Sequence, residues 1–303
     1  MTLTQLKYVV TVAEAGSMNE AARILFISQP SLSASIKELE DEIGIVIFKR
    51  TNRGISVSEA GEEFIGYARQ MVEQYQLIEA RYIYRETVKK KFSVSMQHYT
   101  FAVSAFIELV KQFGMDEYEF AVRETKTYDV IEDVKNCRSE MGILYINDFN
   151  RKVLFKLFQE FGLEFHEIMK CHIYVYMAKS HPLAKKKELT LEELEDYPCL
   201  SFEQGNNNSF YFAEEVLSTF AYKRLIKAND RATLLNLMVG LNGYTLCSGI
   251  ICEDLNGADY CAVKLASDEE MTIGYLVRKG MRISALGEKY LEEICRYRDK
   301  ALD

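Results

Sequence analysis

Helix-capping residues and glycine stops recur at short intervals in the first 44 residues, and they divide this stretch into three helices. A side-chain oxygen just before a helix accepts hydrogen bonds from the free N–H groups of its first turn, and glycine readily adopts the left-handed conformation that ends it. The predicted caps are Thr2, Ser17 and Ser28, and the predicted stops are Gly16 and Gly44. The second helix carries Ala21 and Ala22, whose small side chains allow the close helix crossing of a helix-turn-helix.

The third predicted helix has two faces of different character. Apolar residues at helical spacing are expected to point inward: Leu32, Ile36, Leu39 and Ile43. After Pro30, which a first turn tolerates, the other face carries Gln29, Ser31, Ser33, Ala34 and Lys37. Small polar groups with one lysine suit a DNA major groove about 12 Å wide. Two short strands are expected next, at 45–49 and 55–57, around a basic tip with Arg50 and Arg53.

A family resemblance rests on one long run and several spaced residues. The run is SMNEAARILFISQPSLS, residues 17–33, and the spaced residues are Leu39, Glu40, Gly44, Phe48, Arg50, Gly54, Ser58, Ala60 and Gly61. This pattern closely resembles the LysR-type transcriptional regulators, densely over about the first 65 residues and weakly beyond them. The resemblance implies a winged helix-turn-helix over residues 1–58. It places Gln29, Pro30, Ser31 and Ser33 on the recognition helix and Arg50 and Arg53 in the wing.

Ala34 departs from the family pattern, because many members carry arginine at this position. Its absence removes a possible bidentate contact to guanine, worth about 1–3 kcal/mol of discrimination. The base preference would then depend more on Gln29, Lys37 and the wing. Two plainer interpretations stay open: Lys37 as a solvated helix charge, and the two wing arginines as solubilising loop residues.

The charge balance excludes a generally basic nucleic-acid binder. The net charge is −8 and the sequence pI is near 5.3, so any DNA affinity must come from a local patch. The first 58 residues hold six basic and six acidic side chains, and most of the acidic ones cluster at the far end of the third helix. We therefore expect DNA to contact the opposite end. The composition, 48% hydrophobic and 27% charged, is that of a globular protein.

A long helix is predicted from Ser58 to about residue 87, as a dimerising linker over 59–88. Apolar residues alternate spacings of four and three, the period of a coiled-coil seam: Phe64, Ala68, Met71, Tyr75, Ile78 and Tyr82. The alternative is that this stripe packs against its own domain. Two DNA-binding heads would bind far better than one if the half-sites match their spacing.

From Lys91 onward, strands and helices alternate, which predicts an α/β domain with a largely parallel sheet. Strands are expected at 92–96, 119–123, 141–146, 162–168, 172–178, 199–202, 223–227, 243–246 and 272–277. Helices are expected at 102–113, 128–137, 209–221, 231–241 and 286–297. The family resemblance, supported weakly by residues 181–184 and 239–245, implies two α/β subdomains hinged like a periplasmic binding protein. We place the first at 91–161 and 266–303 and the second at 162–265.

Polar residues that follow the strands predict where an effector binds, because ligands of such sheets lie beyond the carboxyl ends of strands. The predicted effector residues are Gln97, His98, Tyr99, Thr100, Thr127, Gln204, Asn206 and Asn207. By family position, Tyr99, Thr100 and Thr127 lie in the inducer cleft, and the asparagine-rich loop faces them. The alternative is that these residues are ordinary caps and surface turns.

Other functions have weaker support. The four histidines lack the paired spacing of a metalloenzyme, and no phosphate-binding glycine motif is present, so we expect no catalysis, metal or cofactor. Seven cysteines without a C-x-x-C favour reduced thiols in the cytoplasm. Peroxide-sensing relatives carry a reactive cysteine after the strand that corresponds to 199–202, where this chain has Asn206 to Asn208. A redox sensor and a cytoplasmic solute-binding module remain alternatives.

The sequence therefore predicts a DNA-binding transcription regulator. We expect it to bind double-stranded promoter DNA as a homodimer or homotetramer and to respond to a small-molecule effector. No segment approaches the roughly 18 apolar residues of a membrane span, so no membrane partner is expected.

Overall fold

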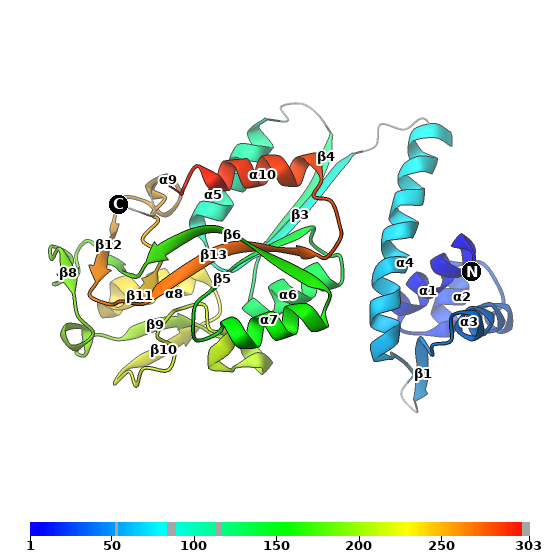
Figure 1. The fold of residues 1–303 in the computed structure, drawn as a ribbon, viewed down its shortest axis with the longest axis horizontal. Coiled ribbons are helices and arrows are strands. Elements are labelled where there is room, and N and C mark those ends of the chain that lie inside the picture. Colours follow the sequence, from blue (N-terminus) through cyan, green and yellow to red (C-terminus); the bar gives the residue numbers. More distant parts are fainter. Residues whose placement is uncertain (52–53, 84–88, 113–116, 299–303) are drawn as a thin grey trace. The chain divides into compact units, whose positions relative to one another are not determined.

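The computed structural model describes residues 1–51, 54–83, 89–112 and 117–298. It divides into two compact units, Met1–Lys90 and Lys91–Asp303, which we describe separately (Figure 1). The first unit holds the predicted winged helix-turn-helix and the linker helix. The second holds the predicted effector domain.

Three capped helices open the chain, at Leu3–Ala15 (α1), Met18–Ile24 (α2) and Gln29–Ile43 (α3). The predicted caps are confirmed: Thr2 forms a capping box with Gln5, and the Ser17 and Ser28 side chains accept from backbone N–H groups three residues on. Gly16 and Gly44 end α1 and α3 in the left-handed conformation. The inward faces form one core with Val9, Val12, Ala21, Ala22, Leu32, Ile36 and Leu39.

The wing is the antiparallel pair β1 (Phe48–Thr51) and β2 (Gly54–Val57). The first strand begins later than the predicted range 45–49. Glu40 explains the shift, because its Oε1 accepts from the N–H groups of Ile47 (2.6 Å) and Phe48 (3.0 Å) and so ties this stretch to α3. Arg53 lies outside the described residues, and only the backbone of Arg50 is described.

The linker helix α4 spans Glu59–Ile78, with Ser58 as its N-cap, and continues as a π-helical turn at Glu79–Ile83. Its predicted end near residue 87 lies outside the described residues. The helix packs along α1, where Ala68 and Val72 contact Leu6 and Val10.

The second unit contains two sheets. The first has the order β4-β3-β5-β13-β6, and the second has the order β10-β9-β11-β7-β12-β8. The first comprises Lys90–Met96 (β3), Tyr118–Glu124 (β4), Met141–Ile146 (β5), Leu163–His172 (β6) and Glu270–Arg278 (β13). The second comprises Tyr174–Ala178 (β7), Glu188–Leu189 (β8), Cys199–Phe202 (β9), Leu225–Ala228 (β10), Tyr244–Cys247 (β11) and Tyr260–Leu265 (β12).

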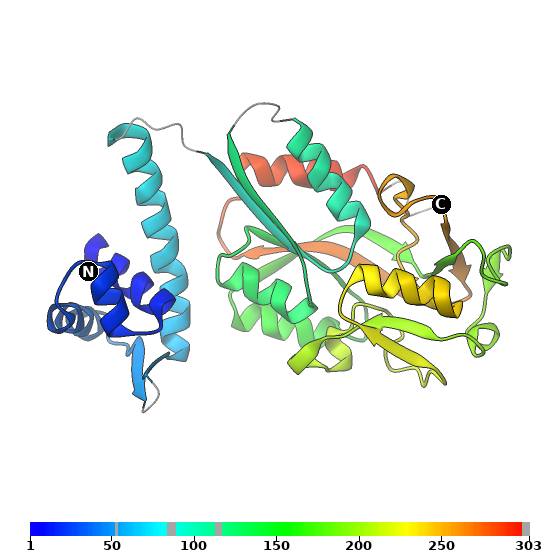
Figure 2. The same ribbon diagram turned by 180° about the vertical axis from the view of Figure 1, so that it is seen from behind.

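Helices cover these sheets. Helices α5 (Thr100–Lys111) and α10 (Ala285–Cys295) lie on one side of the first sheet, and α6 (Thr127–Lys135) and α7 (Arg151–Glu160) lie on the other (Figure 1). Seen from behind, α8 (Arg231–Leu241) lies in front of the second sheet (Figure 2). A short helix, α9 (Glu253–Asn256), precedes β12. The sequence predicted neither α7 nor the strands β8 and β12.

The expectation of a largely parallel sheet is wrong, because both sheets are mixed. Strands β3 and β5 are parallel, but β13 runs antiparallel to β5 and to β6. In the second sheet β7 is antiparallel to both of its neighbours, β11 and β12. The chain crosses between the subdomains twice, and the returning β13 enters the first sheet in the opposite direction.

The first subdomain boundary also needs correction. The sequence placed it at residue 162, but β6 pairs along its length with β13 and therefore belongs to the first sheet. The chain leaves the first subdomain after His172. It returns after β12, close to the predicted residue 266.

The predicted helix at 209–221 is absent, and a single 3-10 turn at Phe210–Phe212 lies in its place. Distant groups bind this segment instead. Tyr145 donates from its hydroxyl to the carbonyls of Ala213 and Glu215, and the Glu215 side chain accepts from the Phe202 N–H. These tertiary bonds override the local helical pattern.

One apolar core extends through both sheets. It joins Val94 and Ile143 of the first sheet to Val175 and Leu246 of the second. The two subdomains are therefore continuous in their interior. None of the described helices combines the length and apolar character needed to cross a bilayer.

Candidate functional site

Helix α3 presents the two faces that the sequence predicted. Leu32, Ile36 and Leu39 are buried, whereas the outer face is exposed or partly exposed. That outer face comprises Gln29, Pro30, Ser31, Ser33, Ala34 and Lys37. The Gln29 amide donates to the Ser33 hydroxyl (2.7 Å), so these two side chains are held together on the helix surface.

A groove of about 790 Å³ runs beside this face, between α3 and the strands of the wing. Ser33, Ala34 and Lys37 line it from α3, and Val46 and Ile55 line it from the wing side. The groove therefore brings together three of the predicted contact residues.

Phe26 was missed by the sequence argument. It lies in the turn between α2 and α3, is 95% exposed and has a φ of 54°, in the left-handed region that non-glycine residues rarely adopt. A large apolar residue two positions before the predicted cap Ser28 was the available signal.

The predicted dimerisation stripe on α4 divides into two groups. Ala68 is buried against α1, and Phe64 packs against the helix-turn-helix core, so these two residues serve the chain's own unit. The Lys7 ammonium lies 4.7 Å from the centroid of the Tyr75 ring. The other three, Met71, Ile78 and Tyr82, are exposed, as is Tyr67, which was not predicted. For Phe64 and Ala68 the alternative interpretation therefore holds, because α4 turns this part of the stripe toward α1.

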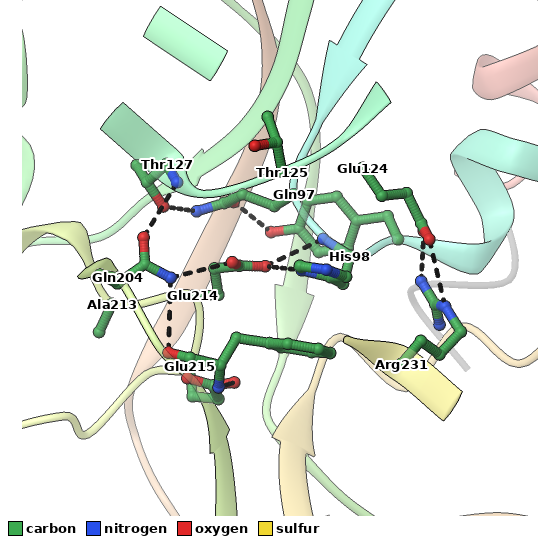
Figure 3. A network of polar contacts seen from close by, with 12 residues as sticks. Gln97, His98, Glu124, Thr125, Thr127, Gln204, Ala213, Glu214, Glu215 and Arg231 are labelled. Carbon is green, nitrogen blue, oxygen red and sulfur yellow. Dashed lines mark hydrogen bonds and ion pairs between the residues drawn. The ribbon is translucent and has the colours of Figure 1, made fainter. Parts of the chain in front are cut away.

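A histidine–carboxylate contact joins the two subdomains of the second unit. His98, just after β3, places its Nδ1 2.7 Å from Glu214 Oε2, and its backbone N–H donates to the same oxygen. The His98 ring stacks on Phe202 with ring centroids 3.7 Å apart and planes 4° apart. Figure 3 shows Glu214 between His98 and Gln204.

Gln97, Thr127 and Gln204 form a buried network next to this pair. Gln97 donates to the Thr127 hydroxyl (2.5 Å), and Gln204 accepts from the Thr127 N–H (3.0 Å) and donates to Glu214 Oε1 (2.9 Å) (Figure 3). These bonds also cross from one subdomain to the other. The predicted residues thus lie together, but the three side chains of this network bind one another.

A cavity of about 90 Å³ opens beside the network. Of the predicted effector residues, His98, Tyr99 and Thr100 line it. Gln97, Thr127, Gln204, Asn206 and Asn207 lie outside its lining. The asparagines lie on the turn Gly205–Asn207, and the chain returns beyond that turn to place Glu214 and Glu215 against the cavity instead. The sequence signal for this return was weak, because it depends on distant contacts.

Arg231, at the start of α8, lines the cavity away from Glu214 (Figure 3). Its guanidinium donates to the Thr100 hydroxyl (2.6 Å) and pairs with Glu124 (2.5 Å). Thr245 also lines the cavity and is 7% exposed. Its hydroxyl is the single buried side-chain polar atom of the described residues that has no hydrogen-bond partner.

Burial shifts several titrations at this site. Burial, and then the neighbouring Glu214, raise the pKa of the Glu215 carboxyl to about 8. Burial also raises the pKa of the Cys171, Cys199 and Cys247 thiols to about 12, so these cysteines hold almost no reactive thiolate at neutral pH. Among the described residues, no group of three or more His, Cys, Asp or Glu side chains could hold a metal ion.

Comparisons with known proteins agree with this architecture. Residues 3–62 match the bacterial regulatory helix-turn-helix protein, lysR family, and residues 98–296 match the LysR substrate binding domain. The chain is 29% identical to the HTH-type transcriptional regulator AlsR of Bacillus subtilis. That alignment covers 66% of this chain and 64% of AlsR, slightly less than two thirds of that relative's length. This chain is also 24% identical to the uncharacterized HTH-type transcriptional regulator YbhD of Escherichia coli, over 95% of this chain and 89% of YbhD.

Solved structures show the same fold. A full-length OxyR variant from Pseudomonas aeruginosa has a TM-score of 0.64 at 19% identity and covers 97% of this chain and 98% of its own. Full-length CbnR in complex with its target DNA has a TM-score of 0.52 at 20% identity, over 98% of this chain and 99% of its own. The chain therefore belongs to the LysR family of bacterial regulators, in which a DNA-binding helix-turn-helix is joined to an effector-binding domain.

Proposed function

We propose that this regulator binds promoter DNA as a homodimer and that a small molecule in the cavity between its effector subdomains changes its DNA affinity. The observation that carries the proposal is the position of the cavity. It lies beside the His98–Glu214 contact, which crosses the two subdomains. An occupant that binds one arrangement of the subdomains more tightly than another shifts the population toward it.

The proposed DNA contacts come from α3 and the wing. Their residues are Gln29, Pro30, Ser31, Ser33, Ala34, Lys37, Arg50 and Arg53. In this assignment Gln29 and Ser33 read base edges, Ala34 contacts a thymine methyl group, and Lys37 and the wing arginines contact phosphates.

The proposed dimer forms along α4 through Met71, Ile78 and Tyr82. These side chains are exposed and recur at the spacing of a helix–helix seam. Self-association gives each complex two heads, which multiplies the contacts with a two-part site.

The proposed role is non-enzymatic and cytoplasmic. Redox sensing by Cys171, Cys199 or Cys247 is disfavoured by their burial and raised pKa values, because oxidation begins at the thiolate. The solute-binding alternative predicts effector binding without any DNA affinity.

A titration of the full-length protein on duplex from its own upstream region, at several salt concentrations, tests this function. Lys37→Ala should weaken binding across sequences and reduce the slope of log affinity against log salt by about one. Lys156→Ala is the matched control, since Lys156 is an exposed helical lysine of α7. Absence of salt-sensitive binding by the wild type would exclude the proposal in favour of the solute-binding module.

A further inference from the structure

The cavity between the subdomains has an acidic side, where a carboxyl group can still accept a hydrogen bond from a ligand. Glu215 lines it, is 8% exposed and accepts from the Phe202 N–H at one carboxyl oxygen. Among the described residues, no cationic group lies within ion-pair distance of its carboxyl. By contrast, the two basic side chains that line the cavity already face carboxylates, His98 at Glu214 and Arg231 at Glu124. A buried carboxyl without a cation stays neutral, and a ligand ammonium would allow it to ionise and form a charge-assisted hydrogen bond.

Another part of the cavity wall suits a carboxylate. Thr100 and Phe101 line it from the first turn of α5, and the N-cap residue Tyr99 makes no side-chain capping bond to this turn. The free N–H groups of a first turn attract anions. Arg231 contacts the same turn through Thr100, and its guanidinium, which also pairs with Glu124, can donate a hydrogen bond to a carboxylate there.

Thr245 gives an independent sign that a polar ligand belongs here. Its hydroxyl is buried, lines the same cavity and has no partner among the described residues. A buried polar atom without a hydrogen bond is destabilising, and a hydrogen bond to a ligand oxygen would remove that cost.

The remaining wall is apolar and limits the ligand's size. Leu234, Leu235, Ile250, Ile251 and Met271 line it, around a volume of about 90 Å³. A small apolar group of the ligand fits this apolar wall better than a further charged group would.

We propose that the effector is a small α-amino acid with an apolar side chain, bound with its ammonium at Glu215 and its carboxylate at Arg231 and the first turn of α5. This inference rests on the effector role proposed above and names the chemical class of that effector. Both charges of the ligand would be matched, whereas a simple anion would leave Glu215 unused.

Calorimetric titration of the full-length protein with matched probes tests the class. The probes are the twenty common amino acids and, for L-leucine, 4-methylpentanoate, which lacks the amine, and 3-methylbutylamine, which lacks the carboxylate. We expect at least one apolar amino acid to bind, and the analogues of leucine or of the best binder to bind at least tenfold more weakly. The class is wrong if no amino acid binds, or if the amine-free analogue binds as tightly.

The pH dependence of binding identifies Glu215 as the ammonium partner. Binding an ammonium favours ionised Glu215, so ligand binding releases a proton wherever Glu215 is still protonated. The pKa of Glu215 in the ligand-free protein is about 8. The affinity for the amino acid should therefore increase by up to tenfold for each unit by which the pH rises toward 8. In Glu215→Gln the affinity should be weaker and independent of pH across this range. Glu203→Gln, a change in the same segment outside the cavity lining, should follow the wild type.

Other titratable groups face Glu215 and need to be accounted for. The acidic and basic neighbours are His98, Glu214 and Lys227, and all three remain in both variants. The remaining neighbours, whose raised pKa values keep them neutral below pH 9, are Tyr99, Tyr145, Cys199 and Tyr222. A Glu215→Gln variant with wild-type affinity and pH profile would overturn the assignment of Glu215.

The Thr245→Val variant separates a ligand contact from a purely structural role. Without ligand it should be at least as stable as the wild type, because a hydroxyl without a partner is removed. Its affinity for the amino acid should nevertheless fall by about fivefold or more, as expected for one lost hydrogen bond of about 1 kcal/mol. Unchanged affinity would remove Thr245 from the site. If no amino acid binds while DNA binding persists and responds to another metabolite, the class fails and the proposed function stands.

Discussion

At the scale of single residues, a buried carboxyl group without a nearby cation is stable mainly in its neutral form, and Glu215 illustrates the effect. Its pKa rises from an ordinary 4.5 to about 8 in the folded chain. Between these values the folded state holds a proton that the unfolded state has released. The contribution of Glu215 to stability is therefore complete below about pH 4.5 and is lost as the pH rises through 8.

Glu215→Gln should become progressively more stable than the wild type from pH 5 to pH 8, because glutamine cannot ionise. The slope corresponds to about 1.4 kcal/mol per pH unit as an upper limit. Thermal unfolding of both proteins across this range measures it, with Glu203→Gln as the control. A constant difference between Glu215→Gln and the wild type would contradict the raised pKa.

Phe26 offers a second residue-scale prediction. Its left-handed backbone conformation disfavours a bulky side chain, and the ring gains little stabilisation from burial because it is exposed. Phe26→Asn should stabilise the first unit by about 1 kcal/mol, since asparagine tolerates this conformation. Urea unfolding followed by circular dichroism tests the change, and a lower stability would show that the ring has an unrecognised contact.

At the scale of elements, α4 divides its apolar residues between two tasks. One side packs on α1 through Ala68 and Val72, and the exposed residues Met71 and Ile78 remain for a partner helix. The same helix can therefore hold the head and join two chains.

The double variant Met71→Asp, Ile78→Asp should convert the dimer into monomers, because it would bring like charges together in an apolar seam. The head should remain folded, since neither residue belongs to its core. Light scattering measures the mass, and Gln76→Asp, at an exposed position of the same helix outside the apolar stripe, controls for the addition of a negative charge. A variant that remains dimeric would move the interface away from this part of α4.

The elements also show what the sequence could and could not predict. The ends of α1 and α3 were predicted because Thr2, Ser28 and Gly44 act on neighbouring backbone groups. The segment 209–221 was predicted as a helix because its local pattern is helical. Its conformation instead depends on Tyr145 and Phe202, which are distant in sequence. For the same reason the sequence pointed to His98, Tyr99 and Thr100, which line the cavity, but not to Glu214, Arg231 and Thr245, which also line it.

At the scale of the molecule, the His98–Glu214 pair joins the two subdomains of the effector unit. Both side chains are almost fully buried. Truncating His98 removes the ring's contact with Glu214 and its stacking on Phe202, whereas Glu214 keeps the bonds from the residue-98 N–H and from Gln204. Loss of one partner of a buried hydrogen bond typically costs about 1–3 kcal/mol. The pair is thus a major contact across the cleft.

His98→Ala should lower the unfolding temperature of the effector unit clearly more than His166→Ala. His166 is the matched control because it is about half exposed and its carboxylate partner lies 3.9 Å away. Scanning calorimetry of the full-length proteins compares them. Equal effects would mean that the contact across the cleft contributes little.

The apolar core that runs without interruption from β3 to β11 limits how far the effector domain can open. A wide opening of the two subdomains would expose Val94, Ile143 and Val175 to water, at a cost of about 25 cal/mol for each Å² of apolar surface exposed. Small rotations that keep this seam dry are far less costly. Ligand binding should therefore cause only a small rotation of the two subdomains relative to each other. Small-angle scattering would barely detect this rotation, whereas distance measurements between labelled sites would resolve it.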